Sequence, residues 1–252
     1  MSILTILGTS SIFAYAASGT TGYMSGSTLY WVLFIGIAII SYIVQMNLQH
    51  KFEKFSKMPL GGGMTGRDIA LKMLHDNGIY DVKVISTAGR LTDHYNPADR
   101  TVNLSEGVYN SSSIAAAAVA AHECGHAIQH ATAYGPLTMR SKLVPVVSFA
   151  SNWMTWILLI GIFTVQMFPA ILLFGIALFA MTTLFSFITL PVEIDASRRA
   201  LAWLERSPVG NTVNQKAAAS ALRSAAYTYI VAALSSLATL IYYVMIYLGR
   251  RD

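Results

Sequence analysis

The chain alternates long apolar segments with two polar ones, and the apolar segments predict its architecture. Three stretches contain no charged side chain. The first precedes Lys51, the second lies between Lys142 and Glu193, and the third lies between Arg223 and Arg250. A helix that crosses the core of a bilayer needs about 20 apolar residues. Each of the three stretches is long enough for at least one such helix, so the pattern predicts transmembrane helices in all of them.

The boundaries of these helices follow from the same pattern. Residues 28–46 fit one span and residues 227–248 fit another. The segment over residues 143–190 is too long for one helix and is interrupted near Pro169, so it predicts a hairpin of two transmembrane helices. Residues 1–27 contain a further apolar stretch without the basic start of a signal peptide, and we treat them as a lead of unassigned role.

The two polar segments comprise residues 47–142 and residues 191–226. In the first, the alternation of side chains predicts short strands over residues 80–86 and 101–104. Three serines at positions 111–113 then open a long Ala-rich helix that ends near Thr132. The chain is therefore expected to be mainly α-helical, with about four transmembrane helices and a small β element.

Composition supports a membrane protein. Hydrophobic residues make up 54% of the chain and charged residues only 12%, whereas a soluble domain carries about 25% charged residues. The net charge is +5, but the basic residues form no dense block, which disfavours nucleic acid as a partner and favours basic loops at one face of a bilayer. The single cysteine, Cys124, excludes an intrachain disulfide.

The Ala-rich helix carries the pattern HExxH, in which His122 and His126 are four residues apart. Residues with this spacing lie on one face of a helix, so the two imidazoles can bind one Zn²⁺ at about 2.0–2.1 Å. Glu123 is about 100° around the helix, where its carboxylate can take a proton from a zinc-activated water. The alternative is a pair of ordinary helix histidines, which is disfavoured because burying these polar groups without a partner is costly.

A catalytic zinc needs a third protein ligand, and His130 is the nearest candidate along the chain. On a continuous helix it lies about 12 Å along the axis from His122, too far for both to share one metal with His126. We therefore expect His130 to be a cleft residue rather than a ligand.

The second polar segment offers a better third ligand. Pro191 suits the first turn of a helix. In that helix Asp195 can pair with Arg199 at the i+4 position, which leaves Glu193 to face the metal. The residues alone leave one alternative open, in which Glu193 is a carboxylate at the membrane edge.

Four stretches of this chain resemble the YugP-like neutral zinc metallopeptidases of bacteria. They are LTDHYNP at residues 91–97, NLSEGVY at 103–109, the run from Ser113 through His126, and PVEIDASRRAL at 191–201. The resemblance covers roughly residues 60–248, and several separated motifs in the same order make it far more specific than HExxH alone. It implies a multi-pass membrane protease, distantly similar to the HtpX-like and CAAX-prenyl peptidases.

The resemblance also implies a zincin-like site of the gluzincin type. His122 and His126 would be ligands, Glu193 the third ligand, and Glu123 the general base. Many gluzincins of this kind have an aspartate four residues after the third ligand, where this chain has Ser197, and the nearby acid is Asp195. This departure affects the assignment of the residue that hydrogen-bonds to the ligands more than the assignment of the ligands themselves.

Three further features are candidates for the surroundings of the metal. His94 either donates a hydrogen bond to the oxyanion of a tetrahedral intermediate or bonds the backbone of its turn. Residues 103–105 are expected to form an edge strand along which an extended peptide pairs. Tyr229 belongs either to the interfacial belt of aromatic residues, with Tyr227, or to the active site.

These observations predict an integral membrane zinc metalloendopeptidase with one Zn²⁺ per chain, acting on a peptide or membrane-protein substrate. The alternative is a zinc-binding membrane protein without hydrolysis, such as a sensor, transporter or inactive scaffold. A transporter would place histidines within its spans, where this chain has none of its six, and an inactive scaffold does not need Glu123. The sequence does not indicate an oligomeric state.

Orientation follows from the basic residues that flank the spans. Three ligands at one metal require residues 47–142 and 191–226 to lie on the same side of the membrane. That side carries seven basic residues close to span ends: Lys51, Lys54, Lys57, Arg140, Lys142, Arg198 and Arg199. The opposite side carries Arg250 and Arg251. The positive-inside rule therefore predicts a multi-pass protein of the cell membrane with its active site facing the cytoplasm.

Overall fold

The computed structural model describes residues 24–207, 209 and 214–249. Most of the lead over residues 1–27 lies outside these residues. In chain order the elements are α2 (Met24–Ser56), α3 (Gly66–Asp76), β1 (Lys83–Thr87), β2 (His94–Asn96), β3 (Thr101–Ser105), α4 (Glu106–Tyr109), α5 (Ile114–Ala131), α6 (Gly135–Thr164), α7 (Pro169–Arg206) and α8 (Gln215–Gly249).

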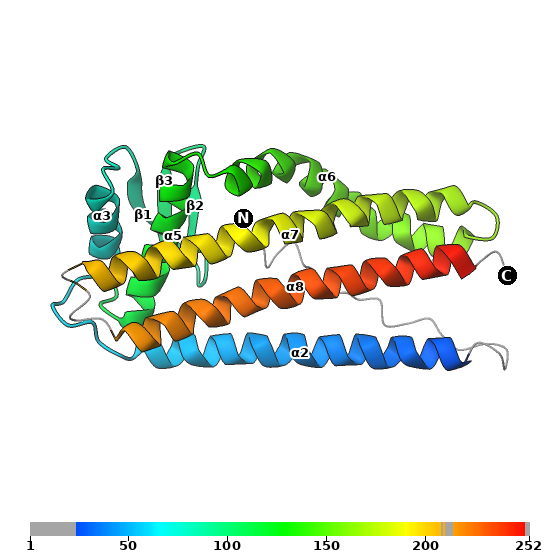
Figure 1. The fold of residues 1–252 in the computed structure, drawn as a ribbon, viewed down its shortest axis with the longest axis horizontal. Helices are drawn as coiled ribbons and strands as arrows, with labels where there is room; N and C mark the ends of the chain where they lie inside the picture. Colours follow the sequence, from blue (N-terminus) through cyan, green and yellow to red (C-terminus); the bar gives the residue numbers. More distant parts are fainter. Residues whose placement is uncertain (1–23, 208, 210–213, 250–252) are drawn as a thin grey trace.

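Four helices, α2, α6, α7 and α8, are long and apolar enough to cross a membrane. Large apolar side chains project from them into the surroundings, and Trp156 is 63% exposed, as expected for helices that face lipid. Figure 1 shows the strands, α3 and α5 gathered at one end of the long helices, with the turn between α6 and α7 at the other. The predicted fold class, mainly α with four candidate spans and a small sheet, is confirmed.

The long helices extend beyond the charge-free stretches into the polar end of the molecule. α7 begins at Pro169, the predicted turn, and continues to Arg206. The expectation that Pro191 opens a new helix is wrong, because Pro191 lies in the interior of α7. An interior proline costs a helix about 3 kcal/mol, and packing of α7 along α5, α6 and α8 compensates for that loss. Glu193 is thus fixed to the same rigid helix as the span.

The small sheet has the order β1-β3-β2, with β3 in the centre. β1 pairs with β3 in parallel, and β2 pairs with β3 antiparallel. The expectation that residues 103–105 form an edge strand is therefore wrong. Val102 and Leu104 are fully buried, which suits a central strand, and the sheet edge nearer to α5 is the short β2.

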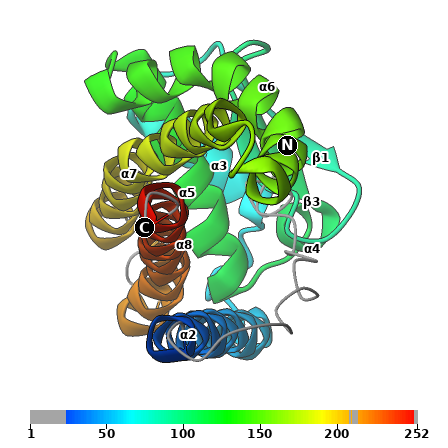
Figure 2. The same cartoon turned by 90° about the vertical axis from the view of Figure 1, so that its right-hand side faces the viewer.

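Helix α5 occupies the middle of the polar end, with α8 on one side and the strands on the other (Figure 2). It begins after Ser113, whose hydroxyl accepts a hydrogen bond from the Ala116 amide. Its many small side chains let neighbouring helices approach closely. α7 approaches α5 closely at Gly125, where an added Cβ would lie 2.6 Å from the Ala196 carbonyl oxygen. This contact brings the HExxH turn of α5 against the segment of α7 that carries Glu193.

Candidate metal centre

Helices α5 and α7 bring together the side chains of His122, His126 and Glu193. The Nε2 atoms of the two histidines lie 3.3 Å and 3.5 Å from the same carboxylate oxygen, Oε2 of Glu193. Four ligands placed tetrahedrally at about 2.0–2.1 Å from zinc are about 3.3 Å from one another. The donor set and its spacing therefore fit one Zn²⁺, and these three residues are the ones that would hold it.

Both imidazoles use their other nitrogen to bind the protein. Nδ1 of His122 lies 3.1 Å from the Ser197 hydroxyl, and Nδ1 of His126 lies 3.0 Å from Oε1 of Gln129. An imidazole that donates through Nδ1 keeps its lone pair on Nε2, and such partners orient metal-binding histidines. The two lone pairs are thus directed towards Glu193.

Gln129 is a site residue that the sequence analysis missed. Its side chain is completely buried, and its amide nitrogen donates to the Val192 carbonyl and to Oδ2 of Asp195, each at 2.8 Å. The predicted pair between Asp195 and Arg199 is present at 2.6 Å. A chain of hydrogen bonds therefore connects Arg199 and Asp195 on α7, through Gln129, to His126 on α5. The sequence offers one signal, an amide side chain about one turn after His126 on a largely apolar helix.

Glu123 lies in the same cavity as the three grouped side chains but is not one of them. The cavity is about 140 Å³ and is bordered by β2, α5, α6, α7 and α8. Burial raises the pKa of Glu123 to about 7, while the neighbouring His122 favours its charged form. A carboxyl group with a pKa near neutrality can both take up and release a proton.

His94 and His130 lie near the cavity in different ways. His94 lines it, and its Nδ1 donates to the Thr92 carbonyl at 2.7 Å. This hydrogen bond is the one expected if His94 bonds the backbone of its turn. In a neutral ring it leaves Nε2 as a hydrogen-bond acceptor. His130 lies outside the grouped ligands, and its Nδ1 is 2.7 Å from the Tyr95 hydroxyl. It therefore ties the end of α5 to β2.

Strand β2 is held at the cavity by Asp93, the residue before it. The Asp93 carboxylate accepts hydrogen bonds from the amide of Ser105, at 2.8 Å, and from its hydroxyl, at 3.1 Å. Burial raises the pKa of Asp93, and these bonds oppose the rise. The start of β2 is thereby fastened to the end of β3.

Two further groups, besides the histidines, interact with Glu193. Nη2 of Arg140 lies 3.9 Å from Oε1 of Glu193, and Tyr229 lines the cavity and interacts electrostatically with Glu193 and Glu123. Tyr227, by contrast, is 52% exposed. Of the two tyrosines, only Tyr229 takes the cavity position.

Cys124 points away from the metal cavity. It is fully buried, and its sulfur faces the Ala70 carbonyl at 3.5 Å. This location agrees with the expected role of a small packing residue.

Comparisons with known proteins agree with this geometry. A family described as "Putative neutral zinc metallopeptidase" matches residues 30–248. The chain is 41% identical over 225 residues to "Putative membrane protease YugP" of Bacillus subtilis (strain 168), an alignment that spans 88% of this chain and 99% of that protein. No solved structure matches the chain.

Proposed function

Since the chain belongs to this family of neutral zinc metallopeptidases, we propose that it is a membrane-embedded endopeptidase of the gluzincin type. The observation that carries the proposal is the meeting of two histidine nitrogens and one carboxylate oxygen at ligand spacing, with Glu123 free of that group in the same cavity. His122, His126 and Glu193 hold one metal ion, and Glu123 is left to handle protons.

The residues divide the work of hydrolysis. Zinc, when bound, lowers the pKa of a water and polarises the carbonyl of the bond to be cleaved. Glu123 takes the proton from the attacking water and passes it to the nitrogen of the leaving amine. Ser197 and Gln129 keep the histidine rings oriented. Arg140 stabilises the carboxylate of Glu193 by its charge.

Strand β2 is the element that suits an extended substrate. It is an edge of the sheet, and His94 and Tyr95 both line the metal cavity. A peptide added to this edge by main-chain hydrogen bonds runs past Glu123. Main-chain pairing with β2 would thus orient the substrate peptide in the cavity without selecting for its side chains.

The variant Glu123→Gln tests the function. It is expected to keep about one zinc per chain and to lose casein hydrolysis by about 10²–10⁴-fold, the usual contribution of a general base. Glu106→Gln, which changes an exposed acid on α4, is the matched control and retains activity. Strong residual hydrolysis in the Glu123 variant contradicts the mechanism, and an inactive wild-type protein with bound zinc contradicts the function.

The metal-bearing end of the long helices faces the cytoplasm in this proposal. Basic residues near span ends support it, because seven of them belong to the two polar segments that carry the metal-binding side chains and only two follow the last span. In a Cys124→Ala background, a membrane-impermeant thiol reagent on intact cells should leave Ser86→Cys unlabelled and label Gln166→Cys. Both positions are exposed, so the opposite pattern places the active site outside the cell.

A further inference from the structure

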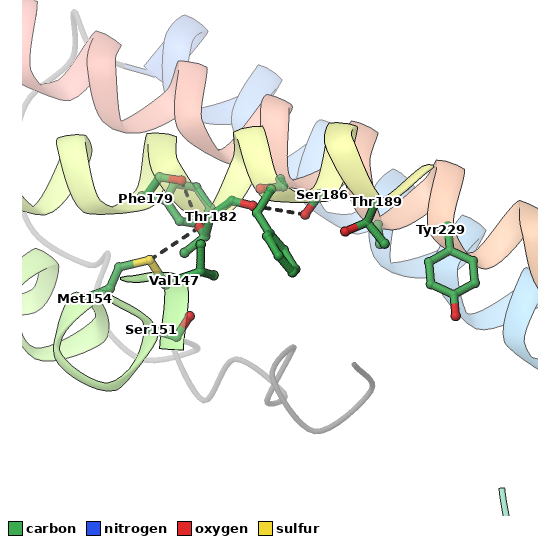
Figure 3. A pocket seen from close by; sticks show the side chains of 11 residues that line it. Val147, Ser151, Met154, Phe179, Thr182, Ser186, Thr189 and Tyr229 are labelled. Atoms are coloured by element: carbon green, nitrogen blue, oxygen red, sulfur yellow. Dashed lines mark hydrogen bonds between the residues drawn. The ribbon is translucent and has the colours of Figure 1, made fainter. Parts of the chain in front are cut away.

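A second cavity lies between α6, α7 and α8, within the charge-free parts of these helices. Its volume is about 90 Å³, several times the ~10–15 Å³ that one water needs. Figure 3 shows Phe179, Thr182, Ser186 and Thr189 in a row along α7, with Tyr229 at one end of the row. The walls thus combine aromatic and aliphatic side chains with a series of hydroxyl groups.

One of these hydroxyls is buried without a hydrogen-bond partner among the described residues. Thr182 donates to the Phe179 carbonyl and Ser186 donates to the Thr182 carbonyl, as serine and threonine usually do in membrane helices. Thr189 is only 3% exposed, yet its hydroxyl makes no hydrogen bond to any described residue. Buried polar groups in native proteins are nearly always paired. The Thr189 hydroxyl therefore indicates a polar group that enters from outside the chain.

The second cavity adjoins the metal centre. Tyr229 lines both cavities, and Thr189 precedes Glu193 by four residues on α7, which places it on the same helix face. Phe179 lies about 15 Å further along the helix from Thr189. The row of side chains thus runs from the metal centre towards the interior of the membrane.

We propose that this intramembrane cavity is a substrate subsite that receives an apolar side chain from the membrane-embedded segment of the protein being cleaved, while Thr189 bonds the main chain of that segment. The proposal rests on the proposed peptidase function. A peptide bond near the membrane must unwind from its helix to be cleaved, and unwound backbone at that depth needs partners within a protein cavity. An acyl chain of a lipid is apolar throughout at this depth, so it offers nothing to the hydroxyl.

The first test compares two substrates in vesicles of phosphatidylethanolamine and phosphatidylglycerol. One is a soluble casein peptide that the protein cleaves, and the other is the same peptide fused to a transmembrane helix of leucine and alanine. Thr189→Val, which removes the hydroxyl and keeps the shape, should slow cleavage of the fused substrate by about 3- to 10-fold, the value of one hydrogen bond. Cleavage of the free peptide and zinc content should stay unchanged.

The control is Thr239→Val, the same change at a hydroxyl that bonds the Ser235 carbonyl within α8 and lies outside the cavity. It should affect neither substrate. An equal loss on both substrates in the Thr189 variant means that Thr189 acts on the metal centre, and no loss on either means that the cavity is not a subsite. Both results overturn the proposal. A wild-type protein that cleaves neither substrate contradicts the peptidase function instead.

The second test needs no catalysis. In a Glu123→Gln background, the photoreactive residue p-benzoylphenylalanine replaces Ala232, which lines the cavity, or Leu234, which is 56% exposed on the same helix. Irradiation should crosslink position 232 to the transmembrane part of the fused substrate and position 234 to lipid. Crosslinking of position 232 to lipid, or to nothing, overturns the proposal whatever the activity of the Thr189 variant.

Discussion

Replacing Gly125 with alanine is expected to displace the proposed metal ligands, His126 and Glu193, while the helices stay folded. The new Cβ would lie 2.6 Å from the Ala196 carbonyl oxygen and 3.0 Å from the Ala196 Cα. Both are backbone atoms, so no side chain can turn aside. Ordinary contacts of a Cβ fall at 3.4–4 Å, and α5 and α7 must therefore separate here by roughly 0.5–1 Å.

Two effects of this substitution oppose each other. Alanine favours the interior of a helix over glycine by about 1 kcal/mol, whereas overpacking costs about 1–3 kcal/mol. The net loss of stability is thus small. The geometric effect is larger, because the clash falls between His126, the next residue, and Glu193, which precedes Ala196 by three. Metal–ligand distances tolerate about ±0.2 Å, so we expect zinc affinity to fall by at least about 10-fold, as it does when the partners of ligands are lost.

The measurement is competition between the purified protein and a zinc-binding dye, together with thermal unfolding in the same detergent. Gly107→Ala is the control, because a Cβ at that position meets nothing within 4 Å. Adding Ala196→Gly to the Gly125 variant should not restore affinity, since the clash involves the backbone of Ala196. Wild-type zinc affinity in Gly125→Ala would refute the claim that this contact sets the spacing of the ligands.

The remaining predictions concern individual side chains of the site. Glu193→Ala should be purified without zinc, whereas His130→Ala should retain about one equivalent by atomic absorption; the reverse result would exchange their roles. Gln129→Leu should lower zinc affinity about 10- to 100-fold, because it removes the acceptor of the His126 Nδ1 proton, and an unchanged affinity in the dye competition would contradict that role. Removing zinc with a chelator should lower the midpoint of thermal unfolding, since binding stabilises only the folded chain, and readdition of zinc should restore it.

Much of the fold follows from the chain's charge pattern. The missing charges locate the four long helices, and the break near Pro169 locates the turn of the hairpin, because transferring a charge into a bilayer is costly. Helix ends depend instead on packing. α7 continues past Pro191 because it contacts α5, α6 and α8, and these contacts join segments far apart in the chain.

The strands show a second limit. β2 has only three residues, His94–Asn96, with no apolar alternation, and its last residue belongs to an Asn-Pro pair, which is typical of a turn. It exists because β3 offers it a partner and Asp93 binds Ser105. Neither the pairing with β3 nor the bond between Asp93 and Ser105 can be predicted from the local sequence. Local patterning therefore predicts an edge strand at β3, whereas β3 lies in the centre of the sheet with Val102 and Leu104 buried.

The hydrogen bonds around the proposed ligands show how this chain can orient them despite one departure from the gluzincin pattern. Ser197 occupies the position where many gluzincins have an aspartate, yet its hydroxyl still meets Nδ1 of His122. The negative charge lies two residues earlier, on Asp195, and reaches His126 through the neutral amide of Gln129. Arg199 balances that charge at 2.6 Å. Helix periodicity predicts the pair of Asp195 with Arg199, but the link to α5 exists only because Gly125 lets the two helices touch.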